Sequence, residues 1–521
     1  MSEDVRLEEI SAADFFYRNK SLAGFDNPVR ATYTIVRELV ENALDAAEMA
    51  ENPPKIQVVM TEYKERDVGS LPWYRIVVAD NGIGLGPDEI PRAFGRVFVS
   101  SKYRLIQSRG TFGLGGTMAL LYGQITTNMP FKVTSAKKGD PVYEIIMMID
   151  IQKNEPVVLD RRILKGISRA SFTVVESYFE GNYPRAKRKI IDYLHQTAIV
   201  VPYADISFMD PEGNFYVYPR STDRLPPRPK EALYHPKGVD LELLQRLLQA
   251  TKARTLKSFL TRHFQRVGGK TASEVLKIAG LPPDKRPSKL TKEEIERLFR
   301  ALKSYDKFLP PDPSVLSPLG ADLFESGIKK ELQPEFVKAV QRPPSVYEAH
   351  PFIVETAIAY GGQIRPTGEI QLYRYANRIP LLYDISSDVS YQIIKRIDWS
   401  NYGIKSPEDE PIVFFVHIVS TKVPFKTVGK EFIANVPEVA KEIELGLRNC
   451  ARDLRIFLSR KRRKEMLRRR YELFKMYYQI IAETLEELLG ERPPVENLLN
   501  KLRVKVGDED EGGDGDQEES S

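Results

Sequence analysis

A glycine-rich stretch in the first quarter of the chain has the composition of a phosphate-binding loop. Four of the seven residues 110–116 are glycine, and an apolar run with helical character follows at 118–122. A glycine-rich loop that enters a helix presents free backbone N–H groups and the positive end of the helix dipole, which together can cradle a phosphate. Taken singly the signal is weak, because glycine loops often serve only as connections.

A predicted helix over 28–50 carries a second polar feature. Asn27 is placed to cap its first turn, directly before a proline. Along this helix Glu38, Asn42 and Asp45 recur at i, i+4 and i+7, so they share a polar face opposite an apolar stripe. For an isolated helix, the simplest interpretation of such a face is exposure to solvent.

A third feature lies at the end of a predicted strand over 73–79. This strand runs directly into Asp80, and Gly82 and Gly84 follow. Glycine lets the backbone turn tightly past a neighbouring group, and polar residues in such connections often bind ligands. A plain turn would explain the same glycines.

In combination and in this order, the three features resemble the Bergerat-fold ATPases, the superfamily of gyrase, MutL, the heat-shock chaperone and the histidine kinases. The resemblance implies ATP and Mg²⁺ as cofactors: Asn42 coordinates Mg²⁺, Asp80 accepts from the adenine amino group, and Glu38 deprotonates the attacking water. Magnesium prefers hard oxygen ligands, and a well-placed general base contributes roughly 10²–10⁴ in rate. Further nucleotide contacts are implied for Gly82, Gly84, Ser101, Lys102, Gly110, Thr111, Phe112, Gly113, Leu114, Gly115, Gly116, Thr117 and Ser171.

Two proline clusters, at 219–236 and 310–318, divide the chain and are interpreted as linkers. The first part has a mixed helix and strand pattern, and the middle part has apolar residues at helical spacing. In the last part, strand-like runs precede a long helix over 438–489. The predicted fold is therefore α+β and multidomain.

The middle part contains a glycine turn with basic residues at 266–281, which resembles the helix-two-turns-helix module of DNA glycosylases. An ordinary helical hairpin is the alternative. The last part contains a lysine-rich segment at 421–431 that is a solvated connection by pattern alone. It resembles the switch-lysine loop in the transducer domain of the type IIB DNA topoisomerase VI B subunits. Within that loop we favour Lys430 over Lys426 as the lysine that reaches the γ-phosphate.

The order of these parts resembles one family, the archaeal-type topoisomerase VI B subunits. The resemblance implies an ATP-hydrolysing subunit that dimerises on ATP binding and passes double-stranded DNA through a break. It implies an A2B2 heterotetramer in which the A subunit carries the cleaving tyrosine, and a cytoplasmic, nucleoid-associated location. The implied divisions are an N-terminal strap (1–20), the ATPase domain (21–225), the helix-two-turns-helix domain (226–308), the transducer domain (309–490) and an acidic tail (491–521).

Two positions depart from this family pattern. Gly116 and Thr117 stand where relatives usually have a valine and a lysine, so we expect backbone amides to make the phosphate contact there. Ser171 stands near where relatives have a threonine, and we expect its hydroxyl to replace the threonine's near the attacking water.

Composition sets further limits. The chain has 521 residues, a net charge of +5 and one cysteine, which excludes an internal disulfide or a cysteine-based zinc site. No apolar run approaches the roughly 20 residues that span a bilayer, so no membrane association is expected.

A basic run at 460–470 is either a solvated face or a contact for DNA or a partner. Rival interpretations are a MutL-like repair protein, a chaperone, or a histidine kinase, although no histidine precedes Glu38.

Overall fold

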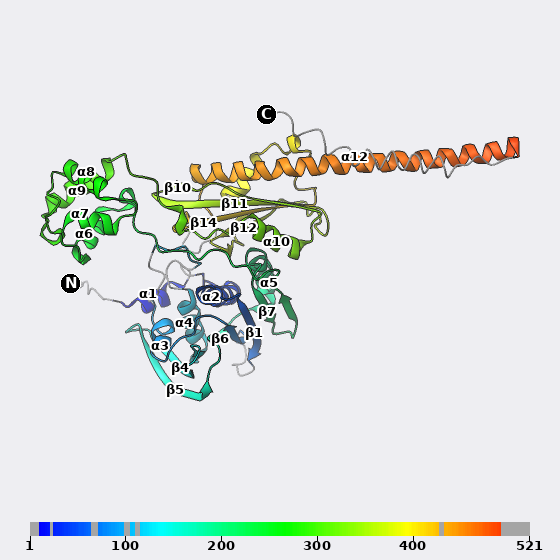
Figure 1. Cartoon of the computed structure of the whole chain (residues 1–521). Helices are drawn as coiled ribbons and strands as arrows, with labels where there is room; N and C mark the ends of the chain where they lie inside the picture. The colour runs from blue at the N-terminus through cyan, green and yellow to red at the C-terminus, as the bar shows by residue number, and fades with distance from the viewer. Residues whose placement is uncertain are drawn as a thin grey trace, which may run out of the picture.

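The computed structural model describes residues 10–20, 24–63, 71–97, 105–109, 115–426 and 432–490. Figure 1 shows a lower body built on one sheet and, above it, a second sheet, with a helical unit on one side and the long helix α12 projecting on the other. Several predictions fall outside the described residues. They concern the start of the strap, the tail, Ser101, Lys102, Gly110, Thr111, Phe112, Gly113, Leu114 and Lys430.

The lower body is an eight-stranded sheet in the order β5-β4-β3-β6-β2-β1-β7-β8. Its neighbouring strands pair antiparallel except β1 and β7, which are parallel. Helices α2, α4 and α5 pack together, with α2 and α4 against the sheet. The strands are β1 (Lys55–Tyr63), β2 (Trp73–Asp80), β3 (Phe131–Ala136), β4 (Pro141–Asp150), β5 (Glu155–Ile167), β6 (Phe172–Glu180), β7 (Asp205–Met209) and β8 (Phe215–Tyr218). The helices are α1 (Ala12–Arg18), α2 (Pro28–Met49), α3 (Glu89–Phe94), α4 (Gly115–Thr127) and α5 (Tyr183–Val200).

Helix α2 begins and ends where its local sequence requires. The Asn27 side chain accepts a hydrogen bond from Arg30 N at 2.8 Å, and a proline occupies the first turn. The helix ends at Met49, shortly before two consecutive prolines that cannot continue it. Its apolar stripe is buried, which confirms the helix predicted over 28–50 to within one residue.

The helical unit contains α6 (Leu241–Ala250), α7 (Leu256–His263), α8 (Gly269–Ala279) and α9 (Lys292–Ser304), and it has a hydrophobic core of its own. Gly280 ends α8 in the left-handed conformation at φ 63°, which glycine adopts without strain. Thr291 and Glu294 form a capping box at the start of α9. The predicted all-helical middle part is confirmed.

The second sheet has the order β10-β11-β14-β12-β13, with β9 pairing to β11. All nine residues of its strand β14 are buried because helices cover both faces, α10 on one side and the first half of α12 on the other. The strands are β9 (Phe336–Gln341), β10 (Ser345–Tyr347), β11 (His350–Tyr360), β12 (Gln371–Ala376), β13 (Ile379–Pro380) and β14 (Ile412–Ser420). The helices are α10 (Ala321–Leu332), α11 (Val389–Arg396) and α12 (Pro437–Leu489).

The two sheets share one hydrophobic core at their junction. Helix α10 packs on α5 of the lower body, and a Cβ on Gly327 would lie 1.9 Å from the carbonyl oxygen of Ile199. Glycine at this position therefore lets the two helix backbones approach closely. Phe324 of α10 joins the same core and contacts Phe415 of the second sheet at 5.9 Å between ring centroids.

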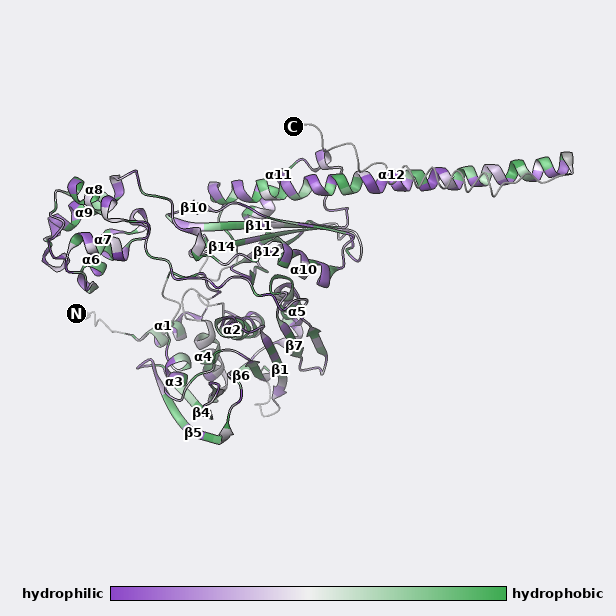
Figure 2. Ribbon diagram, in the orientation of Figure 1, coloured by the Kyte–Doolittle hydropathy of each residue, from purple (hydrophilic) through white to green (hydrophobic). Residues whose placement is uncertain are grey.

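Helix α12 has two dissimilar halves. Its first half contributes Val439, Ile443 and Leu454 to the core of the second sheet. Beyond Leu458 most side chains are exposed, and Figure 1 shows this half leaving the body. Figure 2 shows apolar residues spaced along it among polar ones. Within the part of the chain that the structure describes, no helix is long and apolar enough to cross a membrane.

Candidate functional site

The polar face of α2 meets the first residues of α4. A Cβ on Gly115 would lie 1.4 Å from Oε2 of Glu38, and a Cβ on Gly116 would lie 2.3 Å from Nδ2 of Asn42. With a larger residue at either position, the Glu38 or Asn42 side chain would have to move, so the two glycines let the backbone come close to the carboxylate and the amide. The N-terminus of α4, with its backbone N–H groups, therefore lies directly against two of the predicted site residues.

Asp80 lies at the end of β2, and the turn that follows it contacts α2 at Ala46. Its Oδ1 accepts from Gly82 N at 2.8 Å, and Ile83 N donates to the carbonyl oxygen of Ala46 at 3.2 Å. A Cβ on Gly82 would lie 2.6 Å from that of Ala46, so this turn packs directly on α2. Burial raises the pKa of Asp80 to about 7, although N–H groups of Gly82 and Thr173 act in the opposite direction.

Both the surroundings and the backbone conformation at position 84 require glycine. Its φ is +66°, and a Cβ there would lie 1.9 Å from the carbonyl oxygen of Ala136. The next residue, Leu85, donates its backbone N–H to Oγ of Ser135 at 2.9 Å. The turn after Asp80 is therefore held against β3 as well as α2.

Arg37 is the cation nearest to Glu38 along the same helix. Its guanidinium donates to Oε1 of Glu38 and lies 3.6 Å from Oε1 of Glu41. Burial disfavours the charged guanidinium, but Glu38 and Glu41 hold the pKa of Arg37 above its ordinary range. The ion pair places a cation directly beside the carboxylate that is the expected general base. Sequence reasoning passed over Arg37, although its place next to Glu38 was the available signal.

Ser171 lies just before β6, and Thr173 lies within it. The hydroxyl of Ser171 accepts from the backbone N–H of Lys138 at 3.0 Å. Thr173 pairs with Asp80 across β2 and β6, and its Oγ1 lies 3.0 Å from Oγ of Ser135. Thr173 is therefore a site neighbour that the sequence analysis missed, because the strand register that brings it there is not visible in the sequence.

The remaining described site residues are placed as follows. Thr117 is buried in the first turn of α4. Lys426 is exposed, and its backbone N–H donates to the carbonyl oxygen of Phe432 at 3.5 Å. Among the described residues, no group of three or more histidine, cysteine, aspartate or glutamate side chains could hold a metal ion. A site with Asn42 as the protein ligand still fits Mg²⁺, which usually keeps several waters and binds substrate phosphates.

Comparison with known proteins agrees with this geometry. The family described as "Histidine kinase-, DNA gyrase B-, and HSP90-like ATPase" matches residues 27–140, which contain α2, β2 and the start of α4. The family described as "Topoisomerase VI B subunit, transducer" matches residues 311–470, which contain the second sheet. The fold and site therefore define a nucleotide-binding ATPase joined to a transducer.

Full-length relatives identify the family. The chain is 45% identical to the B subunit of type 2 DNA topoisomerase 6 from Metallosphaera sedula, over 93% of this chain and 91% of that protein. It is 43% identical to the protein of that name from Pyrobaculum aerophilum, over 96% of this chain and 94% of that protein. The chain belongs to the family of type 2 DNA topoisomerase 6 B subunits, and its function is that of an ATP-dependent type II topoisomerase subunit. The repair, chaperone and kinase alternatives are thereby set aside.

Proposed function

We propose that Glu38, Asn42 and Asp80 carry out ATP binding and hydrolysis in this subunit. The supporting observation is that one helix brings Glu38 and Asn42 against the N-terminus of α4, while the turn after Asp80 packs on the same helix. Glu38 takes the proton from the water that attacks the γ-phosphate. Asn42 would hold Mg²⁺, which would neutralise phosphate charge. Backbone N–H groups at the start of α4 bind phosphate oxygens. They make the contact that a lysine would otherwise make at position 117, where this chain has threonine.

Asp80 selects the adenine ring of the nucleotide. Its buried carboxylate accepts a hydrogen bond from the exocyclic amine of adenine. Guanine presents a carbonyl oxygen at the equivalent position, which would leave the buried carboxylate without a donor. ATP is therefore preferred over GTP.

We further propose how hydrolysis acts on DNA. The subunit assembles with a DNA-cleaving A subunit as an A2B2 heterotetramer in the cytoplasm, on the nucleoid. ATP binding joins the two B subunits, with residues 1–20 crossing to the partner, and Lys430 reports whether the γ-phosphate is present. The helix-two-turns-helix unit and the basic run at 460–470 are the candidate contacts for duplex DNA.

The projecting half of α12 supports the docking of another subunit. It carries large apolar side chains that no other part of the described chain covers. An exposed apolar surface of this kind is typical of an interaction site. Those at least half exposed are Met466, Leu473, Tyr477, Ile480, Ile481 and Leu488.

Reconstitution with an A subunit tests the proposed function. Relaxation or decatenation of DNA should require ATP and should be lost in Glu38→Ala, together with ATP hydrolysis. A filter-binding assay with a non-hydrolysable ATP analogue provides the control, since the variant should still bind it. ATP-dependent DNA passage that survives the substitution would refute Glu38 as the base.

A further inference from the structure

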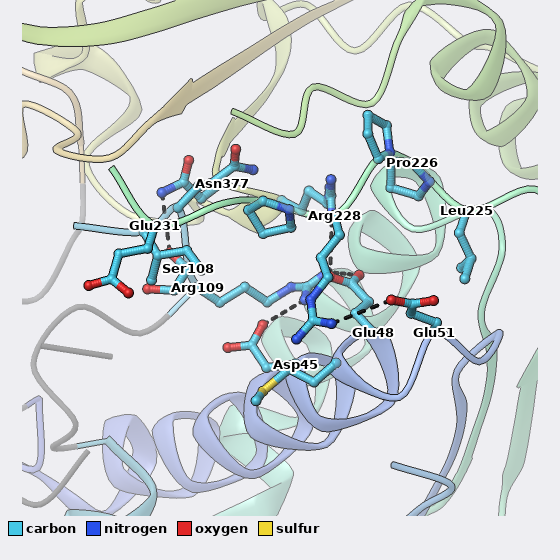
Figure 3. A pocket seen from close by; sticks show the side chains of 16 residues that line it. Asp45, Glu48, Glu51, Ser108, Arg109, Leu225, Pro226, Arg228, Glu231 and Asn377 are labelled. Atoms are coloured by element: carbon cyan, nitrogen blue, oxygen red, sulfur yellow. Dashed lines mark hydrogen bonds and ion pairs between the residues drawn. The ribbon is translucent and has the colours of Figure 1, made fainter. Parts of the chain in front are cut away.

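A second polar cluster lies at the C-terminal end of α2, where the lower body meets the second sheet. A cavity of about 670 Å³ lies there, bordered by the end of α2, residues 106–109, the chain at 225–231 and the turn between β12 and β13. Figure 3 draws the side chains that line it. Glu48 is the centre of the cluster. Its carboxylate accepts from Arg109 at 2.6 Å, from Arg378 at 3.0 Å and from the hydroxyl of Tyr203 at 2.6 Å.

Two arginines in this cluster are almost completely buried. Arg109 is 3% exposed and Arg378 is 4% exposed. Arg109 also pairs with Asp45 at 2.7 Å, so two buried cations are matched by two acids of α2. Burial alone would raise the pKa of Glu48, but Arg109 and Arg378 hold it below its usual range. Removing one partner would leave a buried charge uncompensated, which is strongly unfavourable.

Arg378 occupies a position in which arginine is unusual. Asn377 and Arg378 form the two-residue turn between β12 and β13, with φ values of 47° and 67°. Such a turn favours glycine, because a side chain is strained in the left-handed region. An arginine there points to a role for its side chain rather than for the turn itself. That side chain joins α2 to the second domain, the part of the chain that contains the second sheet. It donates to Glu48 and to the carbonyl oxygen of Ser317, the latter at 2.8 Å.

The same segment of the second domain contacts the other end of α2. The ring of Tyr383 lies edge-on to Tyr33, with 5.7 Å between the centroids, and Arg30 lies 5.3 Å from the Tyr383 ring. Residues 378–383 therefore hold α2 near both of its ends. Glu38 and Asn42 lie between these two points of contact.

We propose that Arg378 is a positioning residue for ATP hydrolysis, which acts by holding Glu48 and thereby α2. An α-helix is stiff along its axis, and Glu48 is ten residues, or about 15 Å, from Glu38. A shift or rotation of α2 at Glu48 is therefore carried to Glu38 and Asn42, which must fit against the glycines of α4. This inference rests on the proposed function. It assigns to the second domain a route to the ATP site that runs through a helix and needs no contact with the nucleotide.

Steady-state ATP hydrolysis by the full-length chain tests the proposal. Arg378→Gln should lower kcat about tenfold, because small misplacements of catalytic groups reduce rates steeply. The affinity for a non-hydrolysable ATP analogue should fall by less than kcat does, since the contacts proposed for Asp80 and α4 are made by groups other than Arg378 and Glu48. Arg378→Lys keeps the charge but not the forked geometry and should give an intermediate kcat. Arg228 lines the same cavity but pairs with the exposed Glu51. Arg228→Gln is therefore the matched control and should leave kcat unchanged.

A double substitution tests whether Arg378 acts through Glu48. In a Glu48→Gln background, Arg378→Gln should change kcat by less than about twofold, because the two residues act as one unit. Multiplicative losses in the double variant would overturn the proposal. So would a kcat within about twofold of wild type in Arg378→Gln or, if that variant does not fold, in Arg378→Lys. Glu38→Ala separates the two hypotheses: retained hydrolysis in that variant refutes the assigned base, whereas it says nothing against Arg378.

Discussion

The two polar clusters along α2 differ in what faces them. Glu38 and Asn42 face the backbone of α4 through two glycines, and Glu38 also pairs with its chain neighbour Arg37. Asp45 and Glu48 instead face arginine side chains from distant parts of the chain. Backbone N–H groups suit a bound anion, so the first cluster is adapted to a ligand. The second cluster is neutralised by the protein and is adapted to joining domains. The same helix thus carries acids of two kinds, and their neighbours decide the role of each.

The largest expected change in kcat comes from replacing a glutamate of each cluster by glutamine. Glu38→Gln should lower kcat by at least about a hundredfold, because the base is lost. Glu48→Gln should lower it only about tenfold, because it acts through position. Steady-state hydrolysis by the two purified variants measures the difference. Equal losses would mean that the distinction between the clusters is wrong.

A smaller effect is expected from adding one methyl group to the first cluster. Gly116→Ala would place a Cβ 2.3 Å from Nδ2 of Asn42, so α4 or the amide must move. Hydrolysis should fall roughly 10- to 100-fold, with weaker binding of Mg²⁺ and nucleotide. Gly268→Ala is the control, because no heavy atom lies within 4 Å of its Cβ and its φ of −83° suits alanine. Wild-type kinetics in Gly116→Ala would show that the close approach has no function.

The smallest effect is a pH dependence at Asp80. Its pKa in the fold is about 7, above the ordinary 3.8, so the unfolding free energy that it contributes falls as pH rises from about 4 to about 7. Adenine binds the ionised form, so analogue affinity should fall about tenfold from pH 8 to pH 6. Titration calorimetry at both pH values measures this change. Asp80→Asn should remove it while keeping any contribution from the phosphates, and an identical pH dependence in the variant would contradict the assignment.

The first cluster was largely predictable from the sequence, and the second was not. The cap at Asn27, the i, i+4 spacing of Glu38 and Asn42, and the glycines at the start of α4 are local signals, and the structure brings these elements together. Glu48 and Arg378 are 330 residues apart, and no local pattern connects them. Their contact depends on how two sheets pack, which helical or strand periodicity does not specify.

The domain boundaries show the same limit. The proline cluster at 310–318 is typical of a linker, yet Ser317 is fully buried and bonded to Arg378. Proline restricts the backbone wherever it occurs, so its presence does not tell a free connection from a packed one. The hydrophobic core likewise continues from the lower body into α10 across the predicted division at residue 309.

The length of α12 gives small rotations a large reach. About 30 residues extend beyond Leu458, which corresponds to roughly 45 Å of helix. If the second sheet turned by about 10°, the far end of a straight rod of that length would sweep through about 8 Å. A rotation of this size at the sheet would thus become, at the tip, a displacement large enough to part or join two protein surfaces.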